Sequence, residues 1–114
     1  MKTYKEIKPF DKRSKPKFEH PDGTIIYGTF LDEVEVEHFS TANHRGKVYK
    51  YLAQLIEYEP NDILGEIKEE LRICYYVIDF KKEKPYWVFG QYALTITIAE
   101  FKDLLNKIKE KGWI

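Results

Sequence analysis

The spacing of hydrophobic and polar residues predicts β-structure after a short N-terminal segment. Residues 25–31 are rich in β-forming side chains, and residues 32–39 alternate apolar with acidic side chains at a period of two. This alternation gives one strand face with Val34, Val36 and His38 and another with Glu33, Glu35, Glu37 and Phe39. We therefore predict a hairpin or two consecutive strands with one wet, acidic side.

The middle of the chain carries a mixed pattern. Residues 48–59 fit a helical stripe through Val48, Leu52 and Leu55, but they also alternate as a strand would. A helix is favoured because leucine, alanine and glutamine prefer it. Residues 61–72 open with Asn61 or Asp62 as an N-cap candidate and place acids in the first turns, so we expect a second helix there.

The C-terminal part of the chain has the pattern of a hairpin followed by a helix. Residues 72–80 and 86–96 are strand-like and are separated by the charged sequence KKEKP. Thr97 and Glu100 have the spacing of a capping box, and Gly112 suits the position just after a helix end. The apolar stripe between them consists of Ile98, Phe101, Leu104, Leu105 and Ile108.

Together these elements predict an α+β fold in the order β-β-α-α-β-β-α, with an antiparallel sheet of about four strands and helices packed on one face. The length of 114 residues suits one domain, which we assign to residues 21–114. Residues 1–20 lack a sustained period and form either a solvated leader or a basic N-terminal arm that lies along phosphates or a partner. Without an apolar span or a leader peptide, we expect a cytoplasmic protein.

The charges cancel over the whole chain but are unevenly distributed. The balance of 19 basic and 19 acidic residues argues against a protein whose whole surface coats polyanions. Five acids and no base lie between Asp22 and Glu37, whereas residues 72–114 hold eight bases and five acids. Basic ends and an acidic middle leave room for a local basic patch. The many lysines, glutamates, isoleucines and tyrosines resemble a thermophile composition.

The aromatic hairpin over residues 72–96 is the strongest functional candidate, because it combines seven aromatic rings with four lysine or arginine charges. One face, from Cys74 to Phe80, is apolar throughout and suits a core, so rings on the other face are expected to meet water. Exposed rings stack on unpaired bases while lysines contact phosphates. The alternative is that the rings belong to the apolar core and that the charged loop is solvated without binding a ligand. The candidate nucleic-acid-binding residues are Tyr75, Lys81, Lys82, Lys84, Tyr86, Trp87 and Tyr92, with Lys15 and Lys17 of the arm.

The sequence YYVIDFKKEKPYWVFGQYALTITIAEFKDLL leads from a strand through a charged loop and a glycine-bearing strand into a helix start. Gly90, Leu94, Thr95 and Phe101 supply the glycine, the Leu-Thr pair and the aromatic residue of the first turn. In these features residues 75–105 resemble the PC4-like family of single-strand DNA-binding transcription cofactors. The resemblance implies a single-stranded DNA ligand. The chain departs from that family in lacking a basic set along the strands and in the two predicted helices before the hairpin.

Two other functions fit parts of the sequence. Asp22 after Pro21, with Asp79 and Lys81 after an apolar run, resembles the PD-(D/E)xK nuclease signature, in which two carboxylates hold Mg²⁺. Pro21-Asp22-Gly23 is better explained as a turn. The acidic middle instead suits a protein-interaction module, such as a small inhibitor or accessory subunit that occupies a basic groove.

No metal site or cofactor is predicted. The three histidines have no ligand-like spacing, and Cys74 is the only cysteine. The sequence therefore favours a non-catalytic protein that binds single-stranded DNA or RNA, with a homodimer and a protein partner as further expectations and no membrane association.

Overall fold

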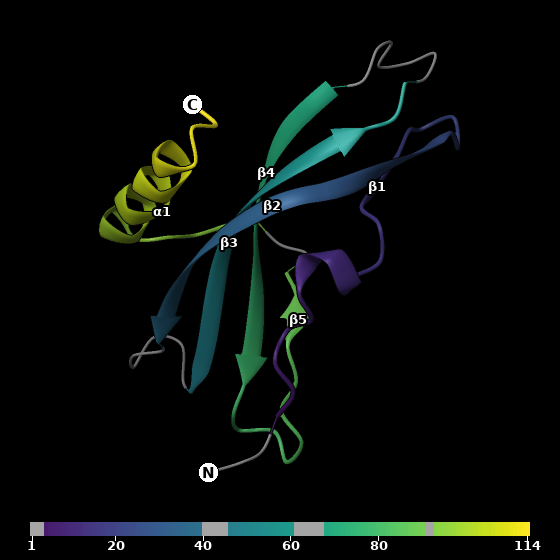
Figure 1. The fold of residues 1–114 in the computed structure, drawn as a ribbon. Coiled ribbons are helices and arrows are strands. Elements are labelled where there is room, and N and C mark those ends of the chain that lie inside the picture. The colour runs from purple at the N-terminus through teal and green to yellow at the C-terminus, as the bar shows by residue number, and fades with distance from the viewer. Residues whose placement is uncertain (1–3, 40–45, 61–67, 91–92) are drawn as a thin grey trace. The chain divides into compact units, whose positions relative to one another are not determined.

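The computed structural model describes residues 4–39, 46–60, 68–90 and 93–114 (Figure 1). Its elements, in chain order, are η1 (Phe10–Lys12), β1 (Lys17–Glu19), β2 (Ile25–Phe39), β3 (Lys47–Tyr58), β4 (Lys68–Asp79), β5 (Val88–Phe89) and α1 (Ile98–Glu110). The strands form one sheet in the order β1-β2-β3-β4-β5, and both edge strands pair antiparallel with their neighbours. None of the helices in the described ranges is long and apolar enough to cross a membrane.

The predicted order of elements is wrong, because the described residues contain five strands and one α-helix instead of four strands with several helices. Residues 47–58 are the strand β3, not a helix. The pattern was ambiguous because both faces of this strand are covered: Lys50, Tyr51, Leu52, Ala53 and Gln54 are all buried. A run that is buried on both sides fits either period.

Two further predicted elements are corrected by the structure. The expected strand pair before residue 40 is a single strand, β2, which is 15 residues long. Of the helix predicted over residues 61–72, residues 68–72 belong to β4, and residues 61–67 lie outside the described part of the chain.

The helix α1 forms as the sequence predicts. The Thr97 hydroxyl accepts a hydrogen bond from the Glu100 N–H at 3.1 Å, and Gly112 has the positive φ of 77° that ends many helices. Leu104 and Ile108 are buried, but Phe101, near the start of the predicted stripe, is 44% exposed.

The contacts within the chain divide it into two compact units. The first unit comprises Met1–Ile7, Val34–Ala53 and Ile73–Ile114, and the second comprises Lys8–Glu33 and Gln54–Arg72. In the first unit α1 covers one face of the strands, where Leu104 and Ile108 pack with Val36, Ala53 and their neighbours Val34 and Trp113. This cluster forms part of the apolar core of the first unit, in which Leu52 and Ile78 are also fully buried.

The second unit is held together by a series of polar contacts. The Arg13 guanidinium binds both carboxylate oxygens of Glu33. The Gln54 amide, which is fully buried, donates to Glu33 Oε2 at 2.9 Å and accepts from Arg72 Nε at 2.8 Å. Arg72 also lies 5.5 Å from the centre of the Phe30 ring. These side chains satisfy one another, as the burial of polar groups requires.

Two residues of β2 approach β3 closely in the second unit. A Cβ atom on Gly28 would lie 2.7 Å from Ile56 Cγ2, so a side chain at this position would displace a side chain of β3. Glu33 accepts a hydrogen bond from the Gln54 amide of β3 at 2.9 Å. The Asp32 carboxylate accepts a hydrogen bond from the Glu33 N–H at 2.8 Å.

Candidate functional site

The predicted hairpin loop follows β4 and carries three exposed lysines. The Asp79 carboxylate accepts a hydrogen bond from the Lys81 N–H at 3.0 Å, and the Asp79 carbonyl accepts from the Lys82 N–H at 3.2 Å. This local bonding is typical of aspartate in tight turns. Lys81, Lys82, Glu83 and Lys84 are all exposed. Three cations are thus held on one short loop with a single acid between them.

Tyr86 lies at the end of this loop and is 58% exposed, more than any other aromatic side chain in the described ranges. Lys82 Nζ lies 5.1 Å from the centre of the Tyr86 ring, within the range of a cation–π contact. The loop therefore presents an exposed ring next to several ammonium groups. Lys81, Lys82, Lys84 and Tyr86 are the predicted site residues that the structure brings together.

Two other predicted site residues pack against neighbouring residues and are not fully exposed on the surface. The Tyr75 ring is 9% exposed and covers Gly90, where a Cβ atom would lie 2.1 Å from the ring. Trp87 is half-buried: its ring lies 5.0 Å from Lys50 Nζ and 6.5 Å from the Tyr4 ring. The Trp87 indole nitrogen is buried and has no hydrogen-bond partner among the described residues. Both rings therefore support the hairpin by packing.

The remaining predicted residues belong to other parts of the chain. Lys15 and Lys17 are exposed and belong to the second compact unit, where Lys17 begins β1. Tyr92 lies outside the described residues.

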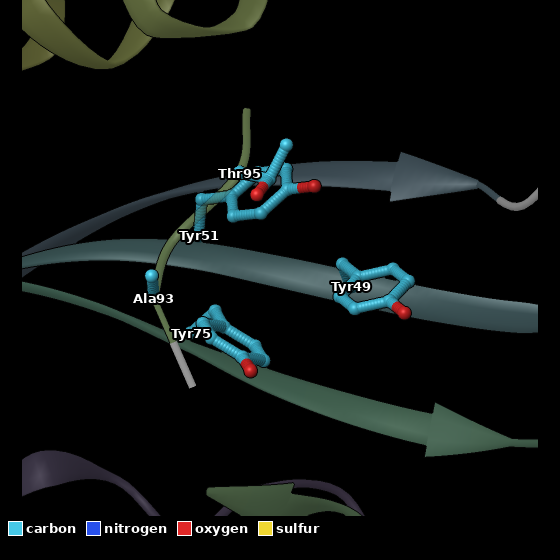
Figure 2. A pocket seen from close by; sticks show the side chains of 5 residues that line it. All are labelled: Tyr49, Tyr51, Tyr75, Ala93 and Thr95. Atoms are coloured by element: carbon cyan, nitrogen blue, oxygen red, sulfur yellow. The ribbon is translucent and has the colours of Figure 1, made fainter. Parts of the chain in front are cut away.

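A second feature of the first unit is an aromatic pocket, which Figure 2 shows. Its volume is about 140 Å³ and it is lined by Tyr49, Tyr51, Tyr75, Ala93 and Thr95. Two of the tyrosines come from β3 and one from β4, while the segment before α1 supplies the two small side chains (Figure 2). We call this group of five residues the tyrosine pocket.

The rings of the tyrosine pocket are evenly spaced. The centres of Tyr49 and Tyr51 are 6.1 Å apart with nearly parallel planes, and those of Tyr49 and Tyr75 are 6.0 Å apart with planes tilted by 47°. Burial and then the negative charge of Glu100 raise the pKa of Tyr51 to about 12. Glu100 in turn lies 2.7 Å from His38 Nδ1, to which it is hydrogen-bonded. The pocket is thus aromatic, and the negative charge of one carboxylate, Glu100, acts on one of its rings.

The two carboxylates of the nuclease-like pattern each stabilise a local turn. Asp22 accepts from the Thr24 N–H at 2.9 Å, and this bond is the largest cause that lowers the Asp22 pKa. Gly23, next to it, has a φ of 89° and donates to the His20 carbonyl at 2.9 Å. Asp79 makes the equivalent bond to Lys81. In the ranges that the structure describes, no three or more histidine, cysteine or acidic side chains are grouped to hold a metal ion.

Sequence reasoning missed the tyrosine pocket because it assigned Tyr49 and Tyr51 to a helix. The signal was present: tyrosines two residues apart share one face of a strand, and Ala53 continues that face. Tyr75 was a candidate for an open surface, but only the position of Gly90 shows that its ring lies against the backbone.

Comparisons with protein-family models, with curated proteins and with solved structures give no match to this chain.

Proposed function

We propose that this protein binds single-stranded nucleic acid, without catalysis or a cofactor, through the loop that follows β4. The observation that carries the proposal is the exposed Tyr86 ring with Lys82 beside it and Lys81 and Lys84 on the same short loop. A base stacks on the ring, and the ammonium groups contact the flanking phosphates. The proposal places the protein in the cytoplasm.

The resemblance of residues 75–105 to PC4-like proteins supports the same ligand. Residues 68–110 run in the order strand, charged loop, short strand, glycine and helix, which is the order on which the resemblance rests. The predicted helices before the hairpin were one of the two departures from that family. Residues 47–58 form a strand in place of the first of these helices.

The acidic surface gives weaker support to the alternative of a protein-interaction module. Lys50 Nζ lies 3.5 Å from Glu6, 3.9 Å from Glu35 and 3.7 Å from Glu37. This central cation offsets part of the negative charge that a mimic of nucleic acid would present to a basic partner. The loop after β4, in contrast, keeps an excess of positive charge, with three lysines to one glutamate.

A titration of a fluorescently labelled oligothymidine, followed by anisotropy at low and moderate salt, tests the proposal. Tyr86→Ala should weaken binding by about fivefold to a hundredfold, because stacking on one ring contributes about 1–3 kcal/mol. Tyr27→Ala is the matched control, since Tyr27 is also exposed, at 49%, but lies on β2. The affinity of the Tyr27→Ala variant for the oligothymidine should equal that of the wild type.

Lys82→Ala should lower the slope of log affinity against log salt by about 0.7, the value for one phosphate contact to a single strand. Lys109→Ala, an exposed lysine of α1, serves as its control. The absence of binding to oligothymidine at low salt, or equal losses for Tyr86→Ala and Tyr27→Ala, would refute the proposal.

A further inference from the structure

The tyrosine pocket has a geometry that nucleic-acid binding at Tyr86 does not use. Tyr49, Tyr51 and Tyr75 have ring centres about 6 Å from one to the next, and all three line one cavity. A cation is attracted to an aromatic ring when it lies within about 6 Å of the ring centre. One small cation in this cavity can therefore lie within that distance of several ring centres at once, as a cation does in an aromatic cage.

The size of the pocket limits what it can hold. Its volume of about 140 Å³ is far above the roughly 10–15 Å³ that one water molecule needs. It is also below the roughly 300 Å³ at which pockets for drug-sized ligands begin. The volume of the cavity therefore matches a compact headgroup and is too small to enclose a whole nucleotide.

The charge and chemistry of the lining select the kind of headgroup. The five described residues that line the pocket include no basic side chain, and the negative charge of Glu100 acts on Tyr51, so an anion is disfavoured. They also include no carboxylate to replace the water around a bare ammonium group, whose N–H donors are costly to leave unpaired. A quaternary ammonium group has no N–H donor to leave unpaired, and its positive charge is attracted to aromatic rings.

We propose that the tyrosine pocket binds a methylated ammonium group, with Tyr49, Tyr51 and Tyr75 as the walls of an aromatic cage. Thr95 and Ala93 close the side of the pocket next to the segment that leads into α1 (Figure 2). This site is separate from the Tyr86 loop and does not depend on strand binding there. Gly90 contributes indirectly, because its missing side chain lets the Tyr75 ring take its position.

The test uses the full chain labelled with ¹⁵N and two small ligands of the same shape. Choline chloride carries the quaternary ammonium group, and 3,3-dimethylbutan-1-ol replaces its nitrogen with carbon and has no charge. Choline should produce saturable shifts at the backbone amides of Tyr49, Tyr51 and Tyr75. The uncharged alcohol should bind about tenfold more weakly, because it lacks the cation–π attraction. Sodium chloride at equal concentration corrects for ionic strength.

A pair of substitutions at Tyr49, the most accessible of the three rings, separates aromatic character from packing. Tyr49→Phe keeps the ring and should bind choline nearly as well as the wild type. Tyr49→Leu removes the ring and should bind about tenfold more weakly. Equal affinity for choline and the alcohol, or choline shifts centred on Tyr86 instead of the pocket, would overturn the proposal even if Tyr49→Leu failed to fold.

Discussion

The two compact units of the chain are stabilised in different ways. The first unit has an apolar core in which Leu104 and Ile108 of α1 pack on Val36 and Ala53. At the centre of the second unit is a hydrogen-bonded series from Arg13 through Glu33 and Gln54 to Arg72. The apolar core depends on volume and close packing, whereas the polar series depends on every donor and acceptor keeping its partner.

This difference predicts which kind of substitution destabilises each unit most. Of the buried hydrophobic side chains in the described residues, nine belong to the first unit and only two, Ile26 and Ile56, belong to the second. Burial of apolar surface therefore contributes less to the stability of the second unit, and specific polar contacts contribute more. The following substitutions test the contrast.

Leu104→Ala should have the largest effect. Leu104 is fully buried in the first unit, and a buried leucine cut to alanine typically costs about 3–5 kcal/mol through lost burial and the cavity it leaves. Urea unfolding should show this loss. Phe101→Ala on the same helix is the control, because Phe101 is 44% exposed and its truncation should cost far less. Similar losses for both would mean that the helix does not pack as described.

Gln54→Leu comes next, at about 1–3 kcal/mol. The leucine has nearly the same shape, but Glu33 and Arg72 each lose a hydrogen bond in a partly buried setting. Glu57→Leu on the same strand is the control and should change the free energy of unfolding by less than about 0.5 kcal/mol. If Gln54→Leu were neutral, the polar series would not stabilise the second unit.

Alkaline pH should produce a smaller, graded loss of stability, on the order of 2 kcal/mol. Burial raises the pKa of Tyr51 from its ordinary value of 10.0 to about 12, so the folded state holds this proton more tightly than the unfolded state. Stability from this group is complete below pH 10 and is lost as the pH rises toward about 12. Unfolding free energies measured over this range should fall less steeply for Tyr51→Phe. The Tyr58 pKa, which burial also raises, accounts for a remaining slope.

The elements that the sequence predicted correctly are those whose signals are local. The capping residue Thr97, the stripe through Leu104 and Ile108, and Gly112 together specify α1 without help from the rest of the chain. The turn at Asp22 is equally local. β3 was predicted wrongly because its pattern depends on what covers each face, and that information lies in distant residues.

In the candidate site, too, local features could be predicted from the sequence and long-range contacts could not. The exposed lysines of the loop could be predicted from KKEKP alone, because a short charged turn is solvated whatever surrounds it. The positions of the rings could not. Tyr75 packs against Gly90, and Trp87 lies near Tyr4 and Lys50, and each of these contacts joins residues that are far apart in the sequence.

The close approach at Gly28 makes the missing side chain part of the packing of β2 on β3. A Cβ atom there would lie 2.7 Å from Ile56 Cγ2 and 3.1 Å from the Tyr58 ring. Ile56 is 1% exposed and has little room to move aside. In evolution or design, this position of β2 is therefore restricted by the volume of its neighbours on β3, and even alanine would require those side chains to shift.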